Sequence, residues 1–348
     1  MYRYSDIKSI HIEPTQGCNA ACPQCDRNIN GGKDNPYLTN AMLSSMDYYE
    51  MFPWHFVEQL DSMYMCGNLG DPCVSNYAVE GFRSFRSANP KIWLGMNTNG
   101  GARPDYFWED LADIDVVVTF SIDGLEDTNH LYRQHVKWER VMENASAFIN
   151  RGGRASWDYI VFKHNEHQVE EARQLAMTMG FEIFQVKKTG RFFSTASHQG
   201  KESHQAVNKK GEKKQKLEKP KDKYINKALH KEQELVTKHG SMNNYYKQVK
   251  IDCKVKKEKS IFITAEGMLM PCCWVGGQMY KWYWPPKHSD VWPFIDKQDL
   301  SVKNNSIKEV MAGPFLKAIE NSWKDESRPK VCANKCGVEF DAFEEQFL

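Results

Sequence analysis

Residues 18–25 read CNAACPQC and come shortly after the strand-like run IKSIHI at 7–12. Three thiols, Cys18, Cys22 and Cys25, therefore lie within eight residues of one loop. Such a loop can ligate three irons of an iron–sulfur cube, which leaves the fourth iron open. A structural zinc site is the alternative, but zinc usually takes four ligands from paired Cys-x2-Cys knuckles. No fourth ligand is near in the sequence, so the spacing favours a 4Fe–4S cluster.

Strand-like and helix-like runs alternate from residue 7 to residue 187. We predict strands at 7–12, 62–66, 91–97, 115–122, 156–162 and 181–187, and helices near 54–61, 77–88, 104–112, 137–150 and 166–179. This alternation implies parallel strands with right-handed crossovers. A partial barrel and a doubly wound open sheet would give the same pattern.

Cys-x3-Cys-x2-Cys after the first strand of such a run resembles the radical S-adenosylmethionine (radical SAM) superfamily, over about residues 7–190. The resemblance implies an α/β fold with a partial (β/α)6 TIM-like barrel. It also implies that the open iron binds S-adenosylmethionine (SAM), that reductive cleavage gives a 5′-deoxyadenosyl radical, and that this radical takes hydrogen from a substrate. A flavodoxin or ferredoxin-type protein would supply the electron.

Several loops that follow the predicted strands also resemble SAM-binding segments of that superfamily. Asp71 stands where relatives carry Glu, Leu69 where they carry Gly, and Gln24 where many have an aromatic residue against the adenine. Asn-Gly and Asp-Gly are ordinary turn dipeptides, so each segment alone is weak. The residues expected to contact SAM are Gly70, Asp71, Pro72, Asn97, Asn99, Ser121, Asp123, Asn165 and Arg191.

A second cysteine group lies toward the C-terminus. Its opening, Cys253-x13-Gly267-x4-Cys272, resembles the twitch and SPASM domains, which carry auxiliary iron–sulfur clusters, and the cysteine count fits one cluster. Cys332-x3-Cys336 would complete four ligands. Cys273 could replace Cys272, although the spacing favours Cys272. Four thiolates could also hold zinc.

One stretch differs in charge from the rest of the chain. Residues 201–260 carry 18 Lys and 8 acidic residues, a net of +10, whereas the remainder has 28 basic and 37 acidic residues, a net of −9. The stretch contains no Arg. A solvated face explains it better than RNA binding does. We therefore predict a barrel domain at 1–190, a Lys-rich insert or linker at 191–250, and a smaller α+β auxiliary-cluster domain at 251–348.

These features predict a radical SAM enzyme in which an auxiliary cluster moves an electron during oxidation or cross-linking of a peptide side chain or small polar metabolite. Sulfur insertion or methylthiolation of a protein or RNA is the second hypothesis, and a non-catalytic zinc- and RNA-binding protein is the third. No run of 18 apolar residues occurs and no signal-peptide layout opens the chain, so we expect a cytoplasmic protein without a membrane span. The sequence names neither the substrate nor a catalytic acid or base.

Overall fold

A curved sheet of mostly parallel strands organises the chain. The computed structural model describes residues 2–188, 190, 192, 202–341 and 346–347. The sheet has eight strands in the order β10-β9-β1-β2-β3-β4-β5-β6. Strands β1 to β6 pair in parallel with their neighbours. They are β1 (Ser9–Ile12), β2 (Ser62–Met65), β3 (Trp93–Thr98), β4 (Val116–Ser121), β5 (Ala155–Val161) and β6 (Ile183–Lys188).

The C-terminal part of the chain extends this sheet. Strand β9 (Ser260–Ile263) pairs in parallel with β1, and β10 (Leu269–Met270) pairs antiparallel with β9. Buried side chains of these strands belong to the same hydrophobic cluster as those of β1 to β6. The sheet is open, with β10 at one edge and β6 at the other.

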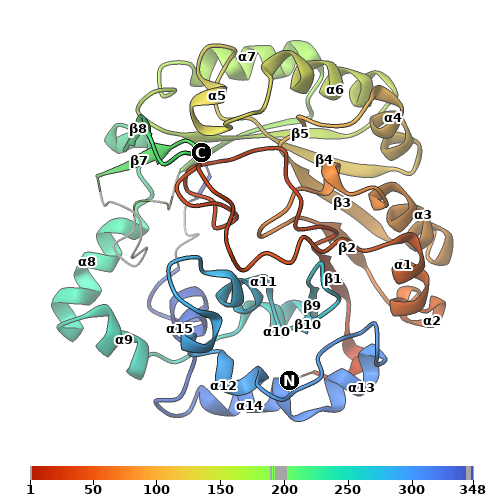
Figure 1. Cartoon of the computed structure of the whole chain (residues 1–348), viewed down its shortest axis with the longest axis vertical. Coiled ribbons are helices and arrows are strands. Elements are labelled where there is room, and N and C mark those ends of the chain that lie inside the picture. Colours follow the sequence, from red (N-terminus) through yellow and green to blue (C-terminus); the bar gives the residue numbers. More distant parts are fainter. Residues whose placement is uncertain (1, 189, 191, 193–201, 342–345, 348) are drawn as a thin grey trace.

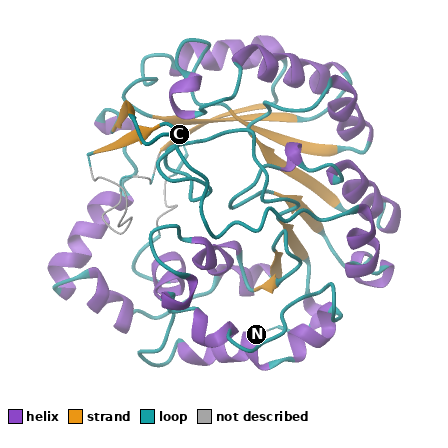
Figure 2. Ribbon diagram, in the orientation of Figure 1, coloured by secondary structure: helices purple, strands orange, loops and turns teal. Residues whose placement is uncertain are grey.

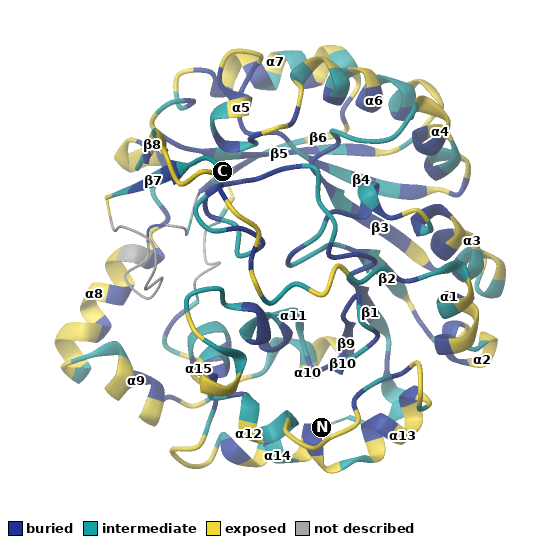
Figure 3. Ribbon diagram, in the orientation of Figure 1, coloured by how far each residue is buried: buried dark blue, intermediate teal, exposed yellow. Residues whose placement is uncertain are grey.

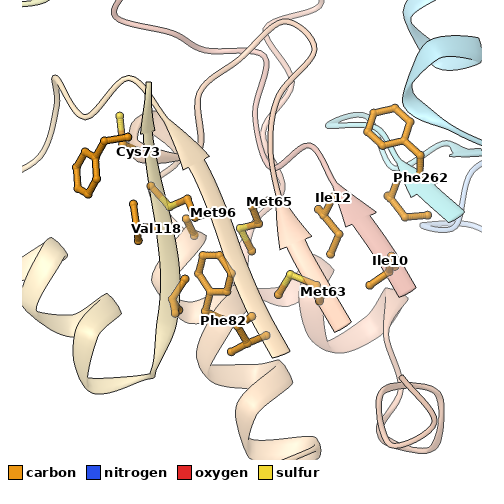
Figure 4. Close-up of a cluster of buried hydrophobic side chains, with 14 of the residues drawn as sticks. Ile10, Ile12, Met63, Met65, Cys73, Phe82, Met96, Val118 and Phe262 are labelled. Atoms are coloured by element: carbon orange, nitrogen blue, oxygen red, sulfur yellow. The ribbon is translucent and has the colours of Figure 1, made fainter. Parts of the chain in front are cut away.

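Helices cover the convex face of the sheet, and loops fill the concave side (Figures 1 and 2). Between the sheet and the helices lies an apolar core, in which Phe82 of α3 is fully buried with side chains of β1 to β4 (Figure 4). The outer faces of the helices are exposed (Figure 3). The covering helices are α1 (Ser45–Met51), α2 (Trp54–Val57), α3 (Ala78–Ala88), α4 (Asp105–Asp113), α5 (Asn129–Tyr132), α6 (Trp138–Asn150) and α7 (Val169–Met179).

Past residue 202 the chain forms a hairpin, then short helices. Strands β7 (Ser203–Val207) and β8 (Lys213–Glu218) pair antiparallel as a separate two-stranded sheet. Helices α8 (Ala228–His239) and α9 (Met242–Gln248) follow. The remaining helices are α10 (Lys254–Glu258), α11 (Cys273–Gly276), α12 (Trp292–Ile295), α13 (Ile307–Ala312), α14 (Pro314–Ser322) and α15 (Lys330–Cys336).

The α/β architecture predicted from the alternation is confirmed, and all six strands of the partial barrel occur near their predicted places. Helix α1 was not predicted; Ser44 begins it with a capping box to Asp47. The hairpin β7–β8 was also missed. The division at residues 190 and 250 stays a prediction. None of the described helices is long and apolar enough to cross a bilayer.

Candidate functional site

The loop that carries Cys18, Cys22 and Cys25 begins just past the carboxyl end of β1. Cys22 is buried and the other two are half-buried. The amide of Cys25 donates to the carbonyl of Cys22 (3.0 Å), which folds the end of the loop into a turn. Burial raises the pKa of the Cys22 thiol to about 11; Arg133 opposes this shift, and Cys25 adds to it. The pKa of Cys18 is raised by burial, then by Asp71 and Cys22. The three thiols thus lie in one electrostatic neighbourhood.

Asp71 ties the loop after β2 to the loop after β3. Its carboxylate accepts hydrogen bonds from the Thr98 hydroxyl (2.6 Å) and from the Asn99 amide and side chain (both 2.7 Å). The Asn99 side chain also approaches Cys18 Sγ at 3.7 Å and donates to Asn19 at 2.9 Å. Predicted residues Asp71 and Asn99 are therefore brought together beside the first cysteine.

Gly70 occupies a position that only glycine fits. A Cβ atom there would lie 1.8 Å from the carbonyl oxygen of Thr15, so the loop after β2 runs directly against the segment before Cys18. The carboxylate of Glu13 holds this loop, because it accepts from the amides of Leu69 (2.7 Å) and Gly70 (3.2 Å). Burial raises the pKa of Glu13 to about 7.

A buried ion pair lies on the other side of the cysteine loop. Arg133 Nε donates to the fully buried carboxylate of Asp123 (2.6 Å), and Arg133 Nη1 lies 3.8 Å from Cys22 Sγ. The other Asp123 oxygen accepts from the amide of Ile160 (2.6 Å). Asp123 is thus occupied by protein partners, and the cation it holds is the group that faces the cysteines.

The remaining predicted pocket residues fall into two sets. Asn165 is fully buried and satisfied by the chain, because it donates to the carbonyls of Asp123 and Ile160 (both 2.9 Å) and accepts from Phe162 (2.7 Å). Asn97 on β3 and Ser121 on β4 are half-buried. Asn97 points away from the helix-facing Met96, since neighbouring side chains alternate along a strand. Pro72 is buried at the start of a short 3-10 helix, Pro72–Val74, and Arg191 lies outside the described residues.

The four predicted distal cysteines line one cavity. Cys253 and Cys336 hydrogen-bond through their thiols, which raises the pKa of Cys253 and lowers that of Cys336. Burial, then the neighbouring thiols, raises the pKa values of Cys272 and Cys332. The rest of the lining is mostly apolar and comes from Ile251, Val255, Pro271, Trp274, Val275, Ile319, Trp323, Val331 and Lys335.

Cys272 and Cys273 are separated by the start of α11. Cys272 is the N-cap residue, in extended conformation with φ −159°, and Cys273 is the first helical residue. Cys272 lines the cavity with the other three thiols, whereas Cys273 is not among the described lining residues. Burial raises the pKa of Cys273 to about 12, and Cys66 and Glu13 contribute. The side chain of Asn68, in the loop after β2, donates to the carbonyl of Cys273 (2.8 Å), so Cys273 lies beside that loop.

Two segments from later in the chain pack on the first cysteine loop. His204 of β7 is buried, and its Nε2 lies 3.0 Å from the carbonyl oxygen of Pro23, between Cys22 and Cys25. Lys281, in the Trp-rich loop after α11, forms an ion pair with Asp26. The first cysteine loop is thus connected both to the hairpin and to the segment that carries the distal cysteines.

The donor set fits iron–sulfur clusters. Among the described residues, no three His, Cys, Asp or Glu side chains are already arranged around one position that a single metal ion could occupy. The first loop nevertheless offers three thiols, and N–H groups are directed at two of the sulfurs. The Ala20 amide and Asn99 Nδ2 approach Cys18, and Arg133 Nη1 approaches Cys22. Hydrogen bonds to the sulfurs are a feature of protein-bound clusters. The distal cavity offers four thiols in apolar surroundings, which suits a closed cluster.

Three residues at this site were not predicted from the sequence. Glu13 directly follows the first strand, so the rule that ligands bind at the carboxyl ends of parallel strands could have identified it. Arg133 lies ten residues after Asp123, and no motif links the two in this sequence. His204 lies in a Lys-rich segment without apolar alternation, and no sequence signal marks it.

No protein-family model matches the sequence, and no curated protein matches it. Solved structures share its fold. Streptococcus suis SuiB bound to precursor peptide SuiA is 14% identical, with a TM-score of 0.55 over 91% of this chain and 67% of SuiB. Native anSMEcpe with bound AdoMet and Kp18Cys peptide is 14% identical, with a TM-score of 0.54 over 97% of this chain and 94% of that one. At such low identity the likeness shows the fold, and it confirms the predicted architecture.

Proposed function

We propose that this chain is a radical SAM enzyme that oxidises or cross-links a side chain of a peptide or protein. One observation carries the proposal. Three thiols share a loop at the carboxyl end of β1, in a fold that is also found in structures with bound AdoMet. These thiols would hold a 4Fe–4S cluster, which would supply the electron for reductive cleavage of SAM and thereby a 5′-deoxyadenosyl radical that takes a hydrogen atom from the substrate.

The residues around the first loop would hold and tune that cluster. Cys18, Cys22 and Cys25 are its proposed ligands, which leaves one iron for the amino and carboxylate groups of SAM. Asn99 and Arg133 direct N–H groups at the sulfurs, which stabilises the charged thiolates. Asp123 keeps Arg133 in place through a buried ion pair. Asp123 and Asn165 therefore act as positioning residues in this proposal, rather than as direct contacts to the nucleoside.

Gly70, Asp71 and Pro72 are the proposed contacts for the methionine end of SAM. The close approach of Gly70 to Thr15 places this loop beside the cysteine loop, and Asp71 is fully engaged in holding Asn99. We assign the contact to backbone groups of the loop, because the Asp71 carboxylate is already satisfied by four donors. Asn97 and Ser121, half-buried on the concave side of the sheet, stay proposed SAM contacts.

The distal cavity is the proposed site of the auxiliary cluster. Cys253, Cys272, Cys332 and Cys336 would occupy all four irons, so no position is left there for substrate or for a donated sulfur. Electron transfer is the role that remains. In the proposed oxidation the substrate loses one hydrogen atom to the deoxyadenosyl radical, then one electron to the auxiliary site and one proton to a base or water. The peptide-bound structures with the same fold support a peptide as substrate.

An anaerobic incubation with SAM, dithionite and a library of short peptides tests this proposal. Mass spectrometry should detect 5′-deoxyadenosine together with a peptide that has lost two hydrogens. A peptide that gains mass through added sulfur would contradict the oxidative reaction and favour sulfur insertion.

A further inference from the structure

The β7–β8 hairpin covers the proposed cluster loop directly. Besides the contact of His204 with Pro23, the amide of Val207 donates to the carbonyl of Asn30 (2.9 Å). Gln215 of β8 donates to the carbonyl of Leu131 at the end of α5. Figure 1 shows the two strands beside this part of the chain. Strand β8 is only one strand spacing, about 4.8 Å, from β7. The hairpin thus brings part of the protein surface close to Cys22 and Cys25.

This surface is basic. Five lysines of the turn and of β8 are exposed: Lys209, Lys210, Lys213, Lys214 and Lys216. None of them forms an ion pair with an acidic side chain in the described part of the chain. By contrast, Lys219 pairs with Glu202 (2.8 Å), and Lys221 pairs with Glu166 (3.4 Å). Five lysines without a described ion pair therefore lie within residues 209–216, a stretch that has Glu212 as its one acidic residue.

The described residues of the segment do not favour RNA. Phosphate and base recognition commonly use Arg forks and exposed aromatic rings, but residues 201–260 contain no Arg. Their three tyrosines, Tyr224, Tyr245 and Tyr246, are all buried. A field of exposed lysines without stacking rings suits a protein partner with an acidic surface, since such charges steer association and set orientation.

We infer that these five lysines, named the hairpin lysines, are the docking surface for an acidic one-electron carrier protein. The inference rests on the proposed function, because a cluster at Cys18, Cys22 and Cys25 needs an external electron for each SAM cleavage. In the transfer the carrier is oxidised by one electron and the enzyme is reduced by one electron, and no bond is made or broken. Docking on the hairpin holds the carrier beside the cluster loop, where the path for the electron is short.

The test compares two quadruple variants with the unmodified enzyme. In the hairpin variant, Lys209, Lys210, Lys213 and Lys214 are each changed to Glu. In the control variant, four exposed lysines elsewhere without a described ion pair are changed to Glu: Lys287, Lys297, Lys308 and Lys317. The two variants change the net charge by the same amount, so a difference between them reports location.

Binding of oxidised flavodoxin is measured first, by the fluorescence anisotropy of its flavin. We expect the Kd of the hairpin variant to rise by about ten-fold or more, and that of the control to change less than two-fold. Binding to the unmodified enzyme should weaken as salt is raised, because exposed charges are screened. SAM cleavage is then driven either by reduced flavodoxin or by dithionite. The hairpin variant should be slow with flavodoxin and normal with dithionite.

Three outcomes would overturn the inference. The hairpin variant could bind flavodoxin as tightly as the control variant does. It could lose dithionite-driven cleavage to the same extent as flavodoxin-driven cleavage. A single-stranded RNA oligonucleotide could bind in a hairpin-dependent manner while flavodoxin binding is unaffected by the substitutions. A failure of the proposed function looks different: neither reductant would support SAM cleavage by any form of the protein, whatever the binding data show.

Discussion

Alanine substitution of Cys272 and of Cys273, one at a time, tests which of these two adjacent cysteines is a ligand of the distal cluster. The first cluster is removed by changing Cys18, Cys22 and Cys25 to alanine, so that the remaining iron reports the distal site alone. Four thiols line the distal cavity and can ligate one cubane, so this background should bind about four irons per chain after reconstitution. Cys272→Ala removes one of four ligands and should lower the iron content to below about two.

Cys273→Ala is the matched control. Cys273 is not among the described lining residues of the cavity and lies beside the loop after β2, so the variant should keep about four irons and an unchanged EPR spectrum. Iron and acid-labile sulfide are measured on anaerobically reconstituted protein. Loss of iron from Cys273→Ala, with iron retained by Cys272→Ala, would refute the assignment of Cys272 as the distal ligand. Bound zinc in place of iron and sulfide would refute the iron–sulfur assignment itself.

Three further predictions concern single side chains. Arg133→Met leaves the buried Asp123 carboxylate without its cation, so the free energy of unfolding in anaerobic urea titrations should fall by about 3–5 kcal/mol. Adding Asp123→Asn should restore part of this loss. An unchanged urea midpoint would contradict the buried ion pair. His204→Ala removes a buried hydrogen bond to the cluster loop and should speed the loss of iron to a chelator several-fold. The control is His230→Ala, which changes an exposed histidine of α8 and should leave this rate unchanged. Equal rates for the two variants would contradict the contact. Burial lowers the pKa of His11 to about 4, so the folded state favours the neutral ring. The free energy of unfolding should therefore fall as the pH drops below 6.5, by about 1 kcal/mol between pH 7.5 and 5.5. In urea unfolding, His11→Phe should flatten this pH dependence, and an unchanged dependence would show that another group titrates.

The strands of the barrel could be predicted because their residues satisfy local and tertiary preferences together. Strand β4, for example, begins with three valines whose branched side chains suit a pleated and buried surface. Strand β8, which reads KKQKLE, has no such preference. The contacts of β7 with the cluster loop and of β8 with α5 hold the hairpin in place, and those contacts join residues far apart in the sequence. The hairpin therefore could not be predicted from local patterns.

The cysteine ligands illustrate the same limit at the site. The four distal cysteines that were predicted from their spacing line one cavity. The spacing was informative because Gly267 (φ +84°) forms the turn of a hairpin that brings distant thiols together. Spacing favoured Cys272 but left Cys273 as an alternative, since the choice depends on where α11 begins. Arg133 was missed for a similar reason: its role depends on a buried partner, and only the fold brings the two together.

The central claim is that this chain cleaves SAM reductively. The most direct test incubates the reconstituted protein with SAM and dithionite and measures 5′-deoxyadenosine by liquid chromatography. We expect 5′-deoxyadenosine from the unmodified protein and from Cys332→Ala, in which only the distal cluster is disturbed. We expect none from the variant with Cys18, Cys22 and Cys25 changed to alanine. Continued SAM cleavage by that triple variant would contradict the claim, and so would an unmodified protein that holds about eight irons yet leaves SAM intact.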